Sequence, residues 1–151
     1  MDAPTLSAVA ADAIRAAVER VIPSDGRPGA REAGTAGYVL ARAAAGDAAL
    51  ALYQAGAARL DALAVARGDG RPFASLSPAD QDAILGDLDA AGSPFFRRLV
   101  VESMEGFYGD PRHGGNHGGL SWELLGFPGP TGGSGYAPPL GWYDDHGGNE
   151  G

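Results

Sequence analysis

Apolar residues recur along the first 108 residues at spacings of three and four, and this pattern most limits what the chain can fold into. Such spacing places side chains on one face of an α-helix, whereas a strand needs alternating apolar and polar residues. No run of alternating β-branched residues competes with it. The periodic runs are separated by glycine and proline, which end helices. The pattern therefore predicts a small all-α bundle of about five helices.

Boundary residues place these helices along the chain. Ser77 and Ser93 each precede a proline, which combines an N-cap hydroxyl with a favoured first helical residue. Pro23 cannot continue the helix before it, and Gly46 and Gly92 end the helices that precede them. The expected helices cover about residues 5–22, 30–45, 47–67, 78–91 and 95–108.

The chain changes character at Gly109. Residues 109–151 are rich in glycine and proline, and only a short helical turn over residues 120–125 is expected there. This segment nevertheless carries large aromatic residues, whereas ordinary linkers have few. They are Trp122, Phe127, Tyr136, Trp142 and Tyr143. We therefore divide the chain into a helical bundle over residues 1–108 and an irregular C-terminal arm over residues 109–151, which lies on the bundle, on a partner, or on both.

Composition excludes several classes of function. The formal net charge of −8 and the pI near 4.6 argue against binding to nucleic acid or to an anionic membrane surface. All 11 basic residues are arginine, so a Schiff-base or P-loop lysine is excluded. The absence of cysteine excludes disulfides and thiolate metal sites. No apolar run approaches the roughly 20 residues of a membrane span, so direct membrane insertion is not expected.

One cluster of polar residues permits a metal-binding interpretation. Glu105, Asp110, His113 and His117 are close in sequence, and their side chains are ordinary metal ligands. Both histidines, however, lie in a glycine-rich loop without a fixed helical spacing. The favoured alternative is that these groups hydrogen-bond to loop backbone or to a partner.

Other chemistry finds less support in the sequence. The triplet at residues 144–146 is interpreted as solvated tail. No serine lies in a nucleophile elbow, and the glycine-rich stretches do not follow a strand, as a dinucleotide-binding loop would. We therefore assign no catalytic, cofactor-binding or metal-binding residue to this chain. Glycines interspersed with large aromatic anchors instead indicate a protein-binding surface.

Six ordered segments of the chain carry a recognisable signature. They are MEGFYGDP at 104–111, HGGN at 113–116, WELLGFPG at 122–129, VIP at 21–23, PGAREAG at 28–34 and LSPADQ at 76–81. Together they resemble the gluconate 2-dehydrogenase subunit 3 family, whose signature contains approximately an EGFF-x-DP stretch, a Y-GGN stretch and a W-x-x-x-GFPG stretch. The resemblance spans about residues 8 to 130, and His113 stands where the family usually has an aromatic residue.

The resemblance implies a non-catalytic small subunit of a dehydrogenase that oxidises sugars or glycosides. FAD and the catalytic histidine are then expected in a large flavoprotein subunit of the glucose–methanol–choline type, and a cytochrome c subunit often takes the electrons. The small subunit binds, stabilises and helps mature its partner. The alternatives are a stand-alone helical adaptor and a His/carboxylate metal-binding protein.

The resemblance also guides the expected site and compartment. The expected partner-interface residues are Phe107, Tyr108, Asp110, Asn116, Trp122 and Phe127. Phe107 also continues the inner stripe of its helix, and Asp110 is placed to brace the loop through backbone N–H groups. The first residues lack an export signal, so a cytoplasmic location is expected as written. A periplasmic location is expected if a twin-arginine leader was removed or if the partner carries the chain across.

Overall fold

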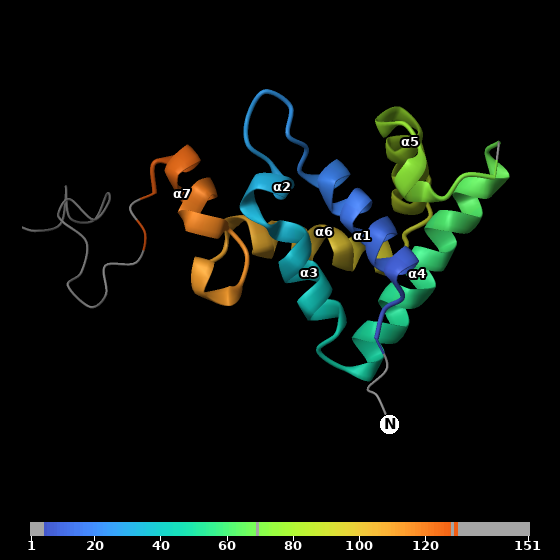
Figure 1. Cartoon of the computed structure of the whole chain (residues 1–151), viewed down its shortest axis with the longest axis horizontal. Coiled ribbons are helices and arrows are strands. Elements are labelled where there is room, and N and C mark those ends of the chain that lie inside the picture. Colours follow the sequence, from blue (N-terminus) through green and yellow to red (C-terminus); the bar gives the residue numbers. More distant parts are fainter. Residues whose placement is uncertain (1–4, 69, 128, 130–151) are drawn as a thin grey trace, which may run out of the picture.

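The computed structural model describes residues 5–68, 70–127 and 129 (Figure 1). Over these residues the chain is all-α and contains no strand, which confirms the predicted fold class. The α-helices are α1 (Ala8–Val21), α2 (Ala30–Ala33), α3 (Thr35–Ala43), α4 (Asp47–Ala66), α5 (Pro78–Ala90), α6 (Pro94–Tyr108) and α7 (Leu120–Leu125). Three short 3₁₀ helices join them: η1 (Phe73–Ser75), η2 (Pro111–His113) and η3 (His117–Gly119).

The helix predicted over residues 30–45 is in fact two helices, α2 and α3, which meet at Gly34. Gly34 has a φ of 68°, in the left-handed region that favours glycine. A Cβ atom there would also lie 2.0 Å from Cε1 of His117, so the ring of this histidine lies directly on the glycine. The other predicted helices are confirmed, with ends shifted by at most three residues.

Serine hydroxyls begin three of the long helices. The Ser77 hydroxyl accepts from the backbone N–H of Asp80 at 3.2 Å, and Pro78 follows it at the first position of α5. Ser93 does the same for α6, with the N–H of Phe96 at 3.3 Å. Each hydroxyl satisfies one of the N–H groups that a helix start leaves without a partner. Ser7 caps α1 in the same way.

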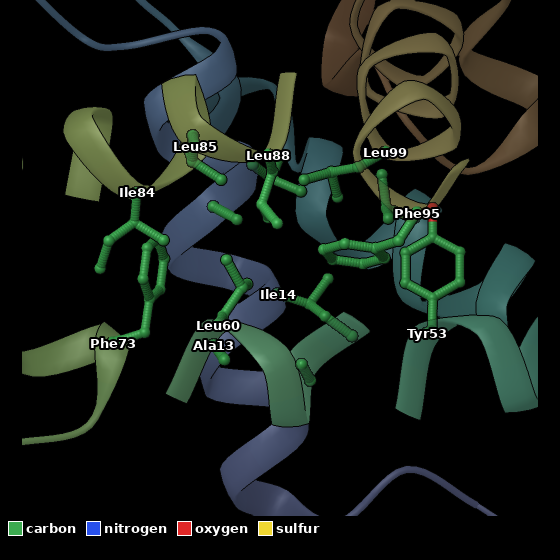
Figure 2. Close-up of a cluster of buried hydrophobic side chains, with 14 of the residues drawn as sticks. Ala13, Ile14, Tyr53, Leu60, Phe73, Ile84, Leu85, Leu88, Phe95 and Leu99 are labelled. Carbon is green, nitrogen blue, oxygen red and sulfur yellow. The ribbon is translucent and has the colours of Figure 1, made fainter. Parts of the chain in front are cut away.

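The hydrophobic core gathers around α1, which contacts α3, α4, α5 and α6 (Figure 2). Its largest apolar side chains come from five different elements and are fully buried. They are Ile14 on α1, Leu60 on α4, Phe73 on η1, Ile84 on α5 and Leu99 on α6. Beside them the rings of Tyr53 and Phe95 meet edge to face at 5.6 Å. Burial of side chains of this size stabilises a fold by about 1.5–3 kcal/mol each.

One buried carboxylate connects α3, α4 and α6. The hydroxyl of Tyr53 donates to Glu102 at 2.5 Å, and the guanidinium of Arg98 donates to the other carboxylate oxygen at 2.9 Å. Arg42 lies 3.7 Å from the same oxygen as Arg98. Burial, followed by the bond to Glu102, raises the pKa of Tyr53 above its ordinary value. The charge of Glu102 is therefore compensated inside the fold.

The segment after α6 folds back onto the bundle at one end of the molecule (Figure 1). There η3 contacts α2, and α7 contacts both α2 and α6. This segment is the part of the predicted C-terminal arm that the structure describes, whereas residues 130–151 lie outside the described residues. None of the described helices combines the length and the apolar character needed to cross a membrane.

Candidate functional site

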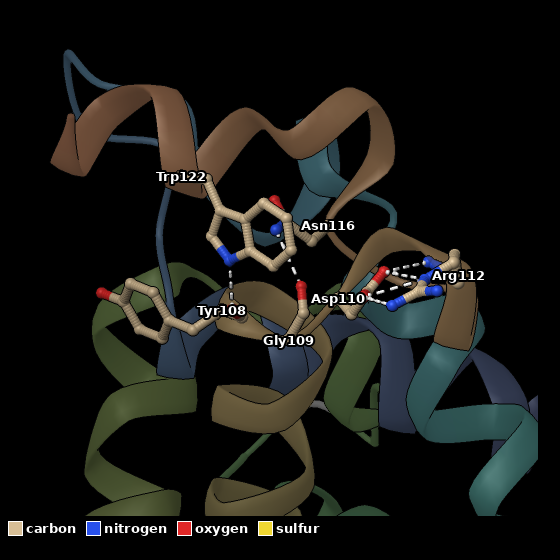
Figure 3. A network of polar contacts seen from close by, with 6 residues as sticks. All are labelled: Tyr108, Gly109, Asp110, Arg112, Asn116 and Trp122. Atoms are coloured by element: carbon tan, nitrogen blue, oxygen red, sulfur yellow. Dashed lines mark hydrogen bonds and ion pairs between the residues drawn. The ribbon is translucent and has the colours of Figure 1, made fainter. Parts of the chain in front are cut away.

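Side chains from the segment after α6 close the C-terminal end of that helix (Figure 3). The last carbonyl groups of an α-helix have no partner within the helix. Here the indole N–H of Trp122 donates to the carbonyl of Tyr108 at 2.7 Å, and the amide of Asn116 donates to that of Gly109 at 2.9 Å. We call residues 109–127 together with Gly129 the α6 cap, because they cover this helix end and satisfy its carbonyls.

Asn116 holds the α6 cap together from inside. Its side chain is fully buried, and both ends of its amide are used, since Oδ1 also accepts from the backbone N–H of Ser121 at 2.9 Å. Its backbone is left-handed, with φ 47° and ψ 51°. Asparagine adopts this conformation more readily than most other residues with a side chain. A residue at position 116 must therefore supply a side-chain hydrogen-bond donor and a side-chain acceptor, and it must also adopt a left-handed backbone conformation.

Trp122 also fixes the residues that follow α7. The backbone N–H of Phe127 donates to the carbonyl of Trp122 at 2.7 Å, and the two rings meet edge to face at 5.2 Å. Aromatic pairs of this kind contribute about 0.5–1.5 kcal/mol beyond the area that they bury. Trp122 therefore connects the end of α6 with the chain beyond α7.

Asp110 braces the first turn of the α6 cap. Its carboxylate accepts from the backbone N–H of Arg112 at 2.9 Å and forms an ion pair with the guanidinium of the same residue. The side-chain bonds from Arg112, followed by the backbone bond, lower the pKa of Asp110 to about 2. Asp110 is thus ionised at neutral pH and engaged within its own loop.

The α6 cap lies directly on the backbone of α6. A Cβ atom added to Gly115 would lie 2.2 Å from the carbonyl oxygen of Gly106. Backbone atoms cannot move aside as the end of a flexible side chain does, so only glycine fits at residue 115. The second glycine of the HGGN segment is therefore explained by close approach of two backbones.

The structure brings the six predicted interface residues together around the α6 cap and divides them by exposure. They are Phe107, Tyr108, Asp110, Asn116, Trp122 and Phe127. Phe107 is 4% exposed and Asn116 is 0% exposed, so both are covered by the chain itself. Tyr108 and Phe127 are 44% and 41% exposed, and their rings reach solvent. The remaining two are partly buried. A partner would touch the exposed members, and the buried ones would hold them in place.

Sequence reasoning missed most of the exposed apolar side chains at and beside this site, since it named only Tyr108 and Phe127 among them. Six of the eight large hydrophobic side chains that are exposed among the described residues lie between residues 101 and 127. They are Val101, Met104 and Tyr108 on α6, and Leu124, Leu125 and Phe127 at the α6 cap. We call the first three the α6 stripe. Their spacing of three and four was visible in the sequence, but it was hidden by the stronger inner stripe of the same helix.

The polar residues of the alternative metal interpretation have other surroundings. The carboxylate of Asp110 is bound by Arg112, and the ring of His117 lies on Gly34. Within the described part of the chain, no three His, Asp or Glu side chains are grouped closely enough to hold a metal ion. The metal interpretation therefore gains no support from the geometry.

Comparison with known proteins supports the sequence resemblance. A family model described as gluconate 2-dehydrogenase subunit 3 matches residues 8–129. The match begins at the first residue of α1 and ends at the last residue of the α6 cap, so it covers both the core and the candidate site. Neither a curated protein nor a solved structure matches the chain. The chain belongs to the gluconate 2-dehydrogenase subunit 3 family, the family of a small subunit of dehydrogenase complexes.

Proposed function

We propose that this chain is the non-catalytic small subunit of an FAD-dependent dehydrogenase that oxidises a sugar or glycoside. Its role is to bind, stabilise and help mature a large flavoprotein subunit of the glucose–methanol–choline type. FAD and the catalytic groups belong to that partner, and a cytochrome c subunit is the expected electron acceptor of the complex. Family membership supports the subunit role, and the exposed surface described above supports direct contact with a partner.

The gathering of exposed apolar side chains on one region carries this proposal. Single exposed apolar residues are normal on a protein surface, but contiguous groups mark interaction sites. Tyr108 and Phe127 supply aromatic rings there, and aromatic residues are enriched among those that dominate binding energy. Leu125, which is 65% exposed, adds an aliphatic side chain to the same region. The other two exposed large hydrophobic residues, Val9 and Val65, lie on α1 and α4.

Co-expression with the flavoprotein encoded beside this chain tests the proposal. The two proteins should elute together in size exclusion, with flavin absorbance in the same peak. The flavoprotein expressed without this chain should be insoluble or lack FAD. Separate elution of the two chains, beside a flavoprotein that is fully loaded and active by itself, would contradict the proposal.

A matched pair of variants locates the contact. Leu125→Asp places a charge on the α6 cap, and Val9→Asp places the same charge on α1 at a side chain of similar exposure, 65% against 60%. The first variant should reduce co-elution and the second should not. Equal loss in both variants would show that the contact is not at the α6 cap.

A further inference from the structure

A hollow of about 510 Å³ on the outer side of α6 carries an excess of arginine. Its polar lining consists of Arg42, Arg97, Arg98, Glu102 and Glu105. Three arginines against two glutamates leave one positive charge in excess, in a chain whose formal net charge is −8. The hollow is therefore a local basic site on an acidic protein.

The charges inside the hollow are unequally engaged. Glu102 binds Arg98 at 2.9 Å, and Arg42 lies 3.7 Å from the same oxygen. Glu105 accepts from the hydroxyl of Tyr38 at 3.2 Å. Among the residues that the structure describes, the guanidinium of Arg97 has no hydrogen-bond or ion-pair partner, and the side chain lies exposed at the hollow. Arg97 is thus the one arginine of the hollow without a carboxylate partner among the described residues.

Most other arginines of the described chain are paired with carboxylates. Arg20 binds Asp82 at 2.7 Å, and Arg67 binds Asp87 at 2.9 Å. Arg27 and Arg59 also have no ion-pair partner within the described ranges, but neither lines this hollow. Arg97 is set apart because it lines this hollow with Arg42 and Arg98, which both contact Glu102, and its own guanidinium is left to bind a further anion.

Arg97 also continues the α6 stripe. It precedes Val101 by one helical turn, and Val101 lines the same hollow. A second hollow, of about 330 Å³, shares these two residues, and its lining includes Asp89, Phe96 and Val100. The α6 stripe thus runs from the α6 cap at Tyr108 to a basic end at Arg97.

We infer that this basic end receives an aspartate or glutamate side chain of the flavoprotein partner, while the α6 stripe receives apolar residues of the same surface. The inference rests on the proposed function and names the chemistry of the contact. A guanidinium fork matches a planar carboxylate and binds it through two parallel hydrogen bonds. A single excess charge flanked by apolar side chains suits one carboxylate of a protein better than a doubly charged phosphate.

Affinity measurements with the full chain and the co-purified flavoprotein test this inference. Arg97→Glu should weaken binding by about tenfold or more, because it places two like charges face to face. Arg97→Lys should retain part of the affinity, since the charge remains but the fork is lost. Arg59→Glu is the matched control, because it makes the same charge change at another exposed arginine without an ion pair. Circular dichroism should show equal helix content in all variants.

The salt dependence gives a second readout. Binding of the wild type should weaken as ionic strength rises, and Arg97→Gln should weaken this dependence. Equal effects of Arg97→Glu and Arg59→Glu would overturn the inference, because only overall charge would then matter. The effect of Arg97→Glu on binding should also be measured in a chain that lacks residues 130–151. If the effect disappears there, the inference is overturned, because the carboxylate that binds Arg97 would then belong to this chain and not to the partner. A wild type that does not bind the flavoprotein would overturn the proposed function itself.

Discussion

The indole N–H of Trp122 and the carbonyl oxygen of Tyr108 are joined by a 2.7 Å hydrogen bond between residues 14 positions apart. This bond ties a partly buried ring to the last residue of α6. The same tryptophan packs edge to face against Phe127. Trp122 therefore contacts both residues that carry the exposed aromatic rings of the candidate interface, through the backbone of Tyr108 and the ring of Phe127, while most of the core lies elsewhere.

Trp122→Ala should reduce partner binding more than it reduces stability. The change removes the bond to Tyr108 and the packing against Phe127, but it leaves the core around α1 intact. Co-elution with the flavoprotein and helix content by circular dichroism measure the two effects separately. Trp122→Phe is the control that keeps a ring and loses only the donor. A Trp122→Ala variant that loses helix content but still binds the flavoprotein would contradict this expectation.

Asn116→Asp should destabilise the protein by about 1–3 kcal/mol, because a carboxylate cannot donate to the carbonyl of Gly109 and would be buried without that bond. Urea unfolding at neutral pH measures the change. Asn116→Gly is the control for backbone conformation, since glycine also adopts the left-handed region. Hydrogen exchange at the amide of Ser121 should become faster in the glycine variant, which lacks the acceptor. Unchanged exchange there would show that the Asn116 side chain does not hold the cap.

Tyr53→Phe should lower the free energy of unfolding by about 1–2 kcal/mol, because it leaves the buried carboxylate of Glu102 without one of its donors. Tyr38→Phe is the matched control. The hydroxyl of Tyr38 donates to Glu105 at 3.2 Å, and Glu105 is an exposed residue of α6, the helix that also carries Glu102. We expect the control to change stability by less than about 0.5 kcal/mol. Equal losses of unfolding free energy in the two variants would mean that the buried bond between Tyr53 and Glu102 stabilises the fold no more than an exposed one does.

The pKa of Asp110 predicts how its loop responds to acid. Arg112 lowers this pKa from 3.8 to about 2, so the folded protein binds a proton here less readily than the unfolded chain. The stabilisation of the folded state by the ionised carboxylate of Asp110 is therefore complete above about pH 4 and is lost as the pH falls towards 2. NMR titration of the Asp110 carboxyl carbon measures the pKa directly. Arg112→Gln should return it towards 3.8, and an unchanged low value would assign the shift to the backbone bond instead.

The sequence predicted most helices, because their starts and ends are encoded locally. Ser77 with Pro78, and Ser93 with the proline after it, begin α5 and α6 where predicted. The break at Gly34 was missed, since glycine within a good helical pattern is often tolerated, and the His117 ring that lies on Gly34 comes from a distant part of the chain. The contact between Gly34 and His117 joins residues that are 83 positions apart in the sequence.

The sequence points to the segment after residue 108 as an interface, which stays a prediction, whereas the internal organisation of this segment could not be predicted. Glycines and aromatics indicated a surface after residue 108, whereas the inward position of Asn116 depends on bonds to Gly109 and Ser121 that only the folded chain reveals. The interpretation of Asp110 as a brace for its loop is confirmed by its bond to the N–H of Arg112. The lack of a partner for Arg97 among the described residues could not be predicted, because the sequence does not show which carboxylates reach a given arginine.

The α6 cap has a consequence for synthesis of the protein. The ribosome makes α6 before the residues that close its end, so Tyr108 stays without its indole donor until the chain has grown past Trp122. A fragment that stops between these two residues would contain every long helix and yet lack the bonds that order the exposed rings. On the proposed function, recognition through this surface would favour copies whose translation has gone beyond α7.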